Sequence, residues 1–395
     1  MKKVLFMLSS MNIGGVEKSF LSLLSKIPKD KYKITLLLLE KKGGFLELIP
    51  DWVTIEEATW FKELKPIIMQ PPQQTILDYK MKHEFIKIPT FIYSYILSEK
   101  LFKDRHIYYK HVFKVIPEHE DTYDIAISYQ GPTETIDYYI ANRVKAKKKI
   151  SWIHFDVSKH QINRKLYTKL YREFDNIFVV SHEGKEKLNE RIPSIRNKVA
   201  VFKNIISTQL INKMSEVEID FEENYKGIKI VTVGRLTKEK GQDLAIKILA
   251  RLRDNGYEVR WYCIGEGEHR KEYENLIEQY GLKKDFLLIG AKTNPYPFIK
   301  KSDIYVQTSR HEGYCLTLAE ARCLNKPIVT TDFTGVKEQI VNNDTGLIVS
   351  FNEDELYLAV KELINNPHLR QQFSNKLLRE QNETIIKEEK IAQLI

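Results

Sequence analysis

Cysteine is scarce in this chain of 395 residues, which contains only Cys263, Cys315 and Cys323. Three thiols are too few for a disulfide framework, and their spacing matches no usual arrangement of metal ligands. We therefore expect a protein of a reducing compartment, the cytoplasm. The sequence also lacks an Asp-x-Asp pair, and we expect no metal cofactor.

Long apolar runs are absent as well. No segment approaches the roughly 18 apolar residues that a membrane-spanning helix needs. The stretch Val4–Leu8 resembles the apolar part of a secretion signal, but it is short and no small-residue cleavage site follows it. We interpret it as the first buried strand. The chain has no internal repeat and no low-complexity tract.

The chain has enough apolar material for two hydrophobic cores. Hydrophobic residues make up 43% of the sequence and charged residues 29%. Because a single core rarely serves more than about 250–300 residues, the length predicts two domains of roughly 200 residues each.

Positive charge is concentrated in the first half of the chain. Residues 1–203 contain 35 Lys and Arg against 24 Asp and Glu, whereas the remainder contains 27 against 29. Within the first half, Lys80–Lys114 is basic and rich in aromatic residues. Such a segment is typical of docking on an anionic membrane surface, and the alternative is a core helix with a solvated face. Nucleic acid is not expected as a partner, because no recognised binding module is present.

Short apolar runs alternate with helical patterns through most of the chain. Runs such as Lys149–His154 and Ile228–Val233 are flanked by amphipathic stretches, which is typical of parallel strands covered by helices on both faces. The fold class is therefore α/β, with two doubly wound, Rossmann-like domains. Prolines interrupt residues 41–119, and we expect an irregular region there.

The alternation also suggests domain boundaries. We place an amino-terminal domain at residues 1–203 and a carboxy-terminal domain at residues 227–370. The acid-rich segment 204–226 is predicted to be a linker. The charged tail 371–395 is predicted to be helical and is a candidate for crossing back to the first domain.

The most informative stretch runs from Arg310 to Ala321, between a predicted strand at Ile304–Thr308 and a helix that Pro327 must end. Free backbone N–H groups and the positive end of the helix dipole meet at such a turn, so we expect it to bind a diphosphate. Glu312 precedes the helix, and Glu320 lies about one and a half turns inside it. Alone, such a pair is more often a pair of solvated helix-end carboxylates.

Other strand-to-helix loops carry suitable residues, because ligands of open α/β sheets bind at the carboxyl ends of the strands. One loop contains Arg235 and Lys240, whose charged donors suit a diphosphate. Glycines in Gly265-Glu266-Gly267 and Gly14-Gly15 permit close approach of a ligand, although turn geometry explains the first pair equally well. His154 ends a strand at the same edge, where a lone histidine is more often structural.

Taken in this order, the motifs resemble those of the retaining family 4 glycosyltransferases, which have the GT-B architecture of two facing doubly wound domains with a cleft between them. The resemblance covers nearly the whole chain. Its most specific parts are Glu312–Glu320 and the loop with Arg235 and Lys240. Cys315 stands where the family often has a second glycine; its side chain would narrow the donor pocket, although one this small should be tolerated. The resemblance also implies that residues 1–203 bind the acceptor and residues 227–370 bind the nucleotide sugar.

The resemblance implies a role for each candidate residue. Glu312 would contact hydroxyls of the transferred sugar, and His154 would lie near its primary hydroxyl; these two form the catalytic set. Glu320 would bind the ribose of a nucleotide donor. The donor-binding set is Gly15, Arg235, Lys240, Glu266, Gly313, Tyr314, Cys315, Leu316, Thr317 and Glu320.

The implied activity is transfer of a sugar from a nucleotide donor to an acceptor, with retention of the anomeric configuration. The expected donor is a UDP-hexose or UDP-N-acetylhexosamine, and the expected acceptor is a cell-surface polysaccharide or lipid-linked glycan. Because the basic loop and the helix start can stabilise the departing diphosphate, no metal is expected. We expect the protein in the cytoplasm or peripherally on the inner face of the cell membrane.

Two other classes of protein stay open. A nucleotide-sugar 2-epimerase can share the GT-B fold and needs no acceptor. An inactive GT-B subunit would bind a partner or a membrane instead of turning over a donor.

Overall fold

The computed structural model describes residues 1–102, 105–155, 157, 162–204, 206, 208–219, 221 and 225–384. The chain forms two compact units. The first comprises Met1–Leu21 and Ile27–Lys203, and the second comprises the chain from Asn204 onward together with the short segment Ser22–Lys26.

The first unit is built on a sheet of seven parallel strands in the order β3-β2-β1-β4-β5-β6-β7. The strands are β1 (Lys2–Leu8), β2 (Tyr32–Leu38), β3 (Thr54–Glu57), β4 (Thr122–Gly131), β5 (Lys145–Ile153), β6 (Asn176–Val179) and β7 (Val199–Val201). Residues 4–8 of β1 and 34–38 of β2 are nearly continuous apolar runs, as expected for strands buried on both faces.

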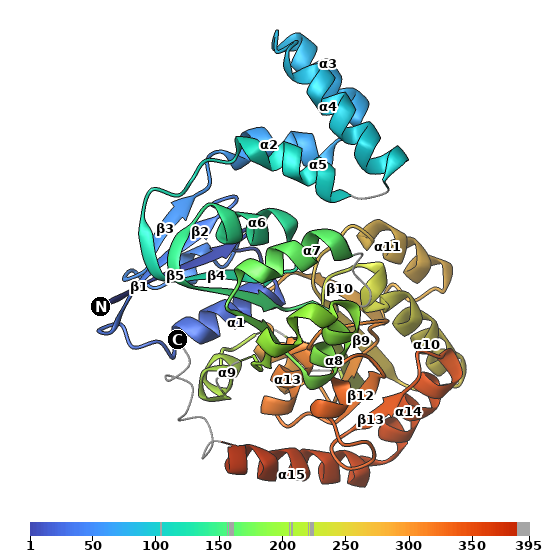
Figure 1. Ribbon diagram of the computed structural model, residues 1–395. Coiled ribbons are helices and arrows are strands. Elements are labelled where there is room, and N and C mark those ends of the chain that lie inside the picture. The colour runs from blue at the N-terminus through green and yellow to red at the C-terminus, as the bar shows by residue number, and fades with distance from the viewer. Residues whose placement is uncertain are drawn as a thin grey trace. The chain divides into compact units, whose positions relative to one another are not determined.

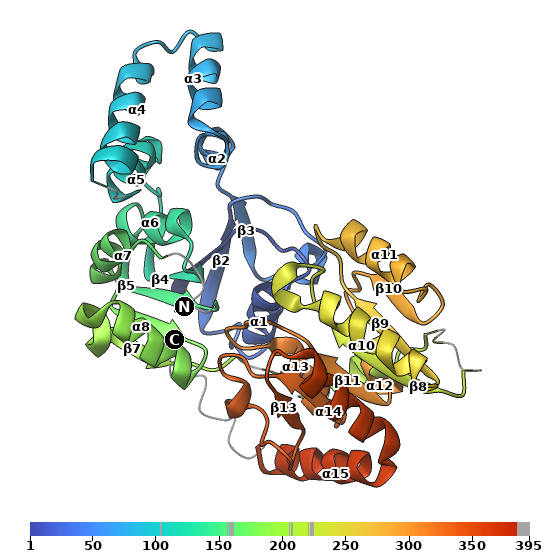
Figure 2. The same ribbon diagram turned by 90° about the vertical axis from the view of Figure 1, so that its right-hand side faces the viewer.

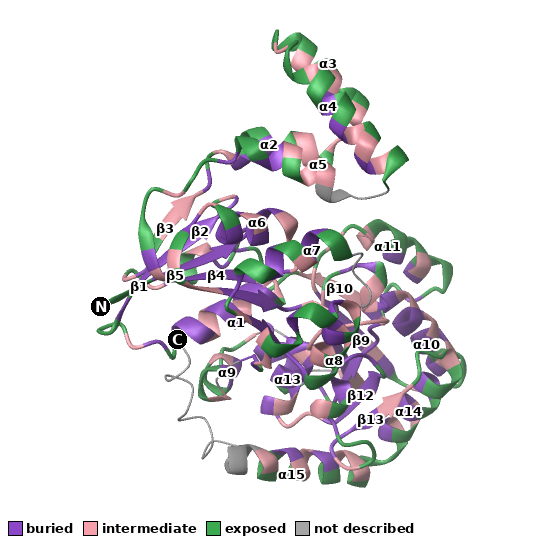
Figure 3. Cartoon of the chain, viewed as in Figure 1, coloured by how far each residue is buried: buried purple, intermediate pink, exposed green. Residues whose placement is uncertain are grey.

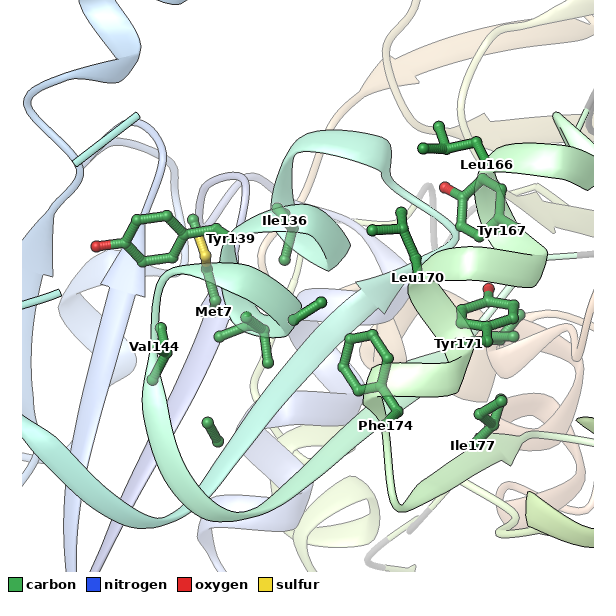
Figure 4. Packing of buried hydrophobic residues seen from close by; sticks show 14 of the residues in the cluster. Met7, Ile136, Tyr139, Val144, Leu166, Tyr167, Leu170, Tyr171, Phe174 and Ile177 are labelled. Atoms are coloured by element: carbon green, nitrogen blue, oxygen red, sulfur yellow. The ribbon is translucent and has the colours of Figure 1, made fainter. Parts of the chain in front are cut away.

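Helices cover both faces of this sheet (Figure 1). The helices of this unit are α1 (Gly15–Leu24), α2 (Phe61–Met69), α3 (Pro72–Met81), α4 (Lys87–Ile96), α5 (Arg105–Val112), α6 (Glu134–Asn142), α7 (Arg164–Leu170) and α8 (His182–Arg191), of which α3 and α4 do not lie on the sheet (Figure 2). On one face, Phe20 of α1 packs edge-on against Phe6, with ring centroids 5.1 Å apart. On the other face, Ile136 of α6 and Leu166 of α7 belong to the core cluster shown in Figure 4.

Residues 41–119 are more regular than predicted. They contain the edge strand β3 and the four helices α2 to α5, and so the expectation of an irregular region was wrong. The prolines misled us because Pro72 and Pro89 lie in the first turns of α3 and α4, where a missing N–H costs nothing. Figures 1 and 2 show α3 and α4 running together away from the sheet of this unit.

The second unit contains six parallel strands in the order β10-β9-β8-β11-β12-β13. They are β8 (Ile228–Val233), β9 (Val259–Ile264), β10 (Phe286–Gly290), β11 (Ile304–Gln307), β12 (Ile328–Thr331) and β13 (Leu347–Val349). The helices are α9 (Thr208–Ser215), α10 (Gln242–Asp254), α11 (Arg270–Gln279), α12 (Tyr296–Lys301), α13 (Leu316–Cys323), α14 (Glu353–Asn365) and α15 (Pro367–Thr384). Two hydrophobic clusters, one on each side of the sheet, complete the predicted doubly wound α/β fold.

Three predicted segments differ in detail. Residues 204–226, predicted as a linker, belong to the second unit, where α9 packs against α12 and α13. At Val336–Val341 the sequence pattern predicts a helix, and the structure has only a 3-10 turn there, at Val336–Glu338. The tail is helical through α15, and the predicted crossing to the first unit falls on residues 385–395, outside the described residues.

The tail helix α15 is packed into the hydrophobic clusters of the second unit. Phe373 and Leu377 are fully buried, whereas Leu378 on the same helix is exposed. We predict that Phe373→Ala lowers the free energy of unfolding of the second unit by about 3–5 kcal/mol, because it leaves a cavity in the core. Leu378→Ala is the matched control and should cost less than about 1 kcal/mol. Urea unfolding followed by circular dichroism measures both, and equal costs would show that α15 is not docked.

Candidate active site

The candidate site lies at the carboxyl ends of β8 and β11, which are neighbours in the sheet of the second unit. β9 and β10 extend from β8 in one direction, and β12 and β13 extend from β11 in the other. The strand order therefore reverses between β8 and β11, which is where doubly wound domains bind their ligands. The two loops with predicted site residues, Gly234–Gly241 and Ser309–Cys315, follow these two strands.

An ion pair joins the two loops. The Nζ atom of Lys240 lies 2.5 Å from Oε1 of Glu312, and the side chains are only 16% and 11% exposed. Burial is the largest single influence and lowers the pKa of Lys240, but the charge of Glu312, the neighbouring Cys315 and the hydrogen bond to Glu312 together raise the pKa above its usual value. Lys240 is therefore a fixed positive charge at neutral pH. The sequence predicted both residues as site residues, but it did not predict their contact.

A chain of hydrogen bonds fixes the position of the Glu312 carboxylate. Ser309 Oγ donates to the same Oε1 at 2.7 Å, and Gln307 Nε2 donates to Ser309 Oγ at 2.8 Å. The hydroxyl of Tyr305 donates to Gln307 Oε1 at 2.7 Å, and Thr331 Oγ1 donates to the carbonyl of Ser309 at 2.5 Å. These residues come from β11, its loop and β12, and we did not predict them. A carboxylate held in this way keeps its position when a ligand arrives.

A second ion pair, between the loop after β11 and helix α10, was also not predicted. Arg310 forms a bidentate ion pair with Asp243 of α10, at 2.9 and 2.6 Å, and its guanidinium lies 4.4 Å from the ring centre of Phe351. The hydrogen bonds from Arg310 to Asp243 hold the pKa of Arg310 above its usual value. Such fork-shaped pairs fix geometry as well as charge. Nothing in the sequence signals the pairing, because the partners lie 67 residues apart.

The other charged candidates are held more loosely. Arg235 is mostly exposed and pairs with Glu239 at 3.0 Å, while Glu266 pairs with Arg270 at 2.9 Å. Exposed pairs of this kind contribute at most about 1 kcal/mol. A diphosphate offers each guanidinium charged hydrogen bonds of about 1.5–3 kcal/mol, so it can displace Glu239 from Arg235. Contact of Arg235 or Glu266 with a donor stays a prediction.

The start of α13 provides the predicted anion-binding turn. Leu316 is its first residue, and Cys315 caps it without a side-chain hydrogen bond. The N–H groups of Leu316 and Thr317 come before the first intrahelical bond, which Ala319 donates to the carbonyl of Cys315. Burial, followed by the charge of Glu312, raises the pKa of Cys315 to about 12, so this thiol stays neutral. Gly313 and Tyr314 complete the turn.

Glu320 lies inside α13 and is buried. It accepts a hydrogen bond from the hydroxyl of Tyr296 at 3.2 Å, a partner that we did not predict. Burial, followed by the charge of Glu320, raises the pKa of Tyr296 far above its usual value, so the phenol remains a donor. Contact of Glu320 with a ribose stays a prediction.

Gly15 and His154 lie in the first unit, also at carboxyl ends of strands. Gly15 begins α1 after β1, and His154 follows β5. In this sheet the order reverses between β1 and β4, and β5 is the next strand beyond β4. His154 is buried, and its ring lies 4.7 Å from that of Tyr129. Both residues thus occupy the ligand-binding edge of their own unit.

Metal ligands do not gather in the part of the chain that the structure describes. No group of three or more His, Cys, Asp or Glu side chains there has the spacing to hold a metal ion. The metal independence of the site is a separate matter and stays a prediction.

Gly241 is the backbone position on which contact between the two loops depends. It adopts a left-handed conformation with φ of +70°, and a Cβ atom there would lie 2.1 Å from the carbonyl oxygen of Thr308. Thr308 Oγ1 in turn donates to the carbonyl of Lys240 at 2.8 Å. No side chain fits here unless the loops separate.

We predict that Gly241→Ala lowers the stability of the second unit by more than about 2 kcal/mol, because left-handed strain adds to a backbone clash. Gly256→Ala is the control. Gly256 is also left-handed, but a Cβ atom there would have no other atom within 4 Å, so only the strain of about 1 kcal/mol applies. Thermal unfolding of both variants measures the difference, and equal losses would contradict close contact of the loops.

Part of the sequence and the whole fold resemble those of known proteins. Residues 215–378 match the family model described as glycosyl transferases group 1. An uncharacterized glycosyltransferase of Methanocaldococcus jannaschii is 29% identical over 178 residues, which are 44% of this chain and 43% of that protein.

A second relative, from Campylobacter jejuni, is 28% identical over 217 residues, which are 54% of this chain and 58% of that protein. It is an N-acetylgalactosamine-N,N'-diacetylbacillosaminyl-diphospho-undecaprenol 4-alpha-N-acetylgalactosaminyltransferase. The chain therefore spans about half the length of the curated relatives that it matches.

Among solved structures, HepE of Anabaena in complex with UDP and glucose aligns with a TM-score of 0.70 and 15% sequence identity, covering 97% of this chain and 95% of that one. At this identity the likeness shows the fold alone. Residues 215–378 are thus similar to the glycosyl transferases group 1 family, and over its length the chain has the GT-B fold of two Rossmann-like domains.

Proposed function

We propose that the protein is a retaining glycosyltransferase that moves a sugar from a nucleotide donor to a glycan acceptor without a metal ion. The proposed donor is a UDP-hexose or UDP-N-acetylhexosamine. The proposed acceptor is a cell-surface polysaccharide or a lipid-linked glycan.

The contact between Lys240 and Glu312 carries this proposal. It places a permanent cation and a hydrogen-bonded carboxylate side by side at the switch point of the second unit. A nucleotide sugar needs both kinds of group, because its diphosphate is anionic and its sugar hydroxyls are donors. The start of α13 adds backbone N–H groups that favour the same anion.

The proposed reaction breaks the bond between the anomeric carbon and the diphosphate oxygen. Positive charge grows on the carbon, and negative charge grows on the leaving diphosphate. Lys240, Arg235 and the N–H groups of Leu316 and Thr317 stabilise the diphosphate, which removes the need for a metal. The acceptor oxygen bonds to the anomeric carbon on the face that the diphosphate leaves, and the acceptor proton passes to a diphosphate oxygen.

The remaining predicted residues have supporting roles in this proposal. Glu312 accepts hydrogen bonds from the hydroxyls of the transferred sugar, and Glu320 accepts from the ribose of the nucleotide. Gly15 gives the diphosphate close access to backbone, and His154 contacts the primary hydroxyl of the sugar. The three cysteines are buried and form no disulfide, which suits a reducing cytoplasm.

The named relatives support the choice of substrates. The Campylobacter jejuni relative transfers N-acetylgalactosamine to an acceptor linked to diphospho-undecaprenol, and HepE has been crystallised with UDP and glucose. These facts belong to those proteins. For this chain they favour a UDP-linked donor and a lipid-linked acceptor over other nucleotides and free sugars.

A proton NMR time course tests the activity directly. The protein is incubated with a panel of nucleotide sugars and EDTA, and Glu312→Gln serves as the control. Release of free sugar and nucleoside diphosphate from one donor, absent in the variant, identifies the donor and supports metal independence. A new anomeric signal from an epimeric sugar would make the protein an epimerase instead. If no donor reacts, the same assay is repeated with lipid-linked acceptors, and inactivity there would leave only a binding subunit.

The two glutamates should respond differently to mutation. We predict that Glu312→Gln mainly lowers kcat, because it removes a charge that contacts the reacting sugar, and that Glu320→Ala mainly raises the Kd for the nucleotide. Each effect should reach about tenfold or more, since charged hydrogen bonds contribute about 1.5–3 kcal/mol.

Tyr296→Phe is the control for Glu320, because it removes the tyrosine hydroxyl and leaves the carboxylate. Its nucleotide affinity should stay within about threefold of the original, corresponding to less than about 1 kcal/mol. Steady-state kinetics and calorimetric titration with UDP measure these quantities. Unchanged kinetics and nucleotide affinity in both glutamate variants would contradict the site assignment.

A further inference from the structure

Exposed apolar side chains are concentrated on the helical arm of the first unit, which we define as residues 61–115. Of the 21 large hydrophobic residues exposed in the described chain, 11 lie between Met69 and Val115. Figure 3 shows exposed and intermediate residues along most of α3 and α4, in contrast to the buried strands of the same unit. Apolar surface gathered in this way marks an interaction site.

A stripe of exposed and partly exposed residues follows one side of α4. Ile86, Thr90, Tyr93, Leu97 and Leu101 follow one another at helical spacing from the residue before α4 to the end of the π-helical turn after it, Leu97–Leu101. Ile86, Tyr93 and Leu101 are 91%, 67% and 65% exposed.

The opposite side of α4 is the packed one. Phe91 on this side is buried and lies edge-on to the rings of Tyr79 and Tyr108. The arm thus has a core of its own, and the stripe is not part of it.

A groove of about 570 Å³ lies beside the stripe, between α4 and α5. Pro89, Tyr93 and Leu97 line it from α4, and the lining is mostly apolar. Lys110 of α5 and Lys114 just after it, one helical turn apart, lie along its other side, and the residues that line the groove include no carboxylate. Burial and the neighbouring Lys114 lower the pKa of His111, so the positive charge comes from the lysines. The groove therefore combines an apolar wall with two lysine cations, and no carboxylate in its lining balances their charge.

We propose that the α4–α5 face of the arm docks on an anionic lipid bilayer, with the phosphate of an acidic phospholipid between Lys110 and Lys114 and the stripe among the acyl chains. Charge complementarity favours this occupant. A symmetric contact with a second copy would bring the same lysines face to face, whereas acidic lipids supply the missing negative charge. An interfacial helix does not need to cross the bilayer, and none of the helices in the described chain is long and apolar enough to do so.

Vesicle co-sedimentation of the full-length protein tests this proposal without any nucleotide, so its outcome is separate from that of the proposed reaction. The vesicles contain phosphatidylcholine alone or phosphatidylcholine with phosphatidylglycerol. We expect binding to the anionic vesicles, weaker binding at high salt, and little binding to phosphatidylcholine. Equal binding to both compositions, or no binding to either, would overturn the proposal.

Two variants test the two parts of the surface. Lys110→Glu/Lys114→Glu should reduce binding to anionic vesicles by a factor on the order of ten or more, since each basic residue near the surface is worth about a factor of five. Ile86→Ser/Tyr93→Ser should reduce it similarly by removing the inserted side chains. All four residues are at least partly exposed, so the melting temperature should not change.

Lys29→Glu/Lys31→Glu is the matched control, because it makes the same change of charge at exposed positions outside the arm. This variant should bind like the original protein. If it loses binding equally, net charge and not the arm is responsible. If sedimentation velocity shows a dimer that Ile86→Ser/Tyr93→Ser dissociates while vesicles are not bound, the face is an interface between copies and the proposal fails.

Discussion

The second unit depends on one costly interaction, the ion pair of Lys240 and Glu312 between the loops that follow β8 and β11. Moving each charge out of water costs several kcal/mol, which is recovered only when geometry and additional hydrogen bonds are good. The chain from Ser309 through Gln307 to Tyr305 and the clamp of Arg310 on Asp243 provide those conditions. Glycine at position 241 lets the backbones approach closely enough for all of them. Such a preorganised arrangement of charge is poor as a source of stability and well suited to a charged ligand.

The two units use the same sheet plan with different chemistry. In each, the strand order reverses beside the strand that comes first in the sequence, β1 in the first unit and β8 in the second. A glycine-containing loop follows that strand. The second unit fills this position with charges of both signs. The first unit places a glycine pair there and a histidine packed among aromatic rings on a nearby strand. The common topology thus carries two different sets of residues at equivalent places, charged side chains in the second unit and glycines with an aromatic-packed histidine in the first.

Much of the fold could be predicted from sequence because buried parallel strands are short apolar runs. The apolar run Ile228–Val233, for example, matches the bounds of β8 to the residue. The arm was not, because prolines in the first turns of helices look the same in sequence as prolines in loops. At the site, individual residues just after the strands could be predicted. The contacts of Lys240 with Glu312 and of Glu320 with Tyr296 could not. Those contacts depend on how strands distant in sequence lie in the sheet.

Only one end of the arm is packed into the core of the first unit. Phe61 and Leu64 of α2 and Val112 of α5, with the adjoining Phe113, belong to the core of the unit, whereas no described residue of α3 or α4 does. Its base is therefore fixed by the fold, while its outer half is free to vary without disturbing the sheet. The outer half can therefore differ in length and sequence between chains of this architecture while the loops at the carboxyl ends of the strands stay the same.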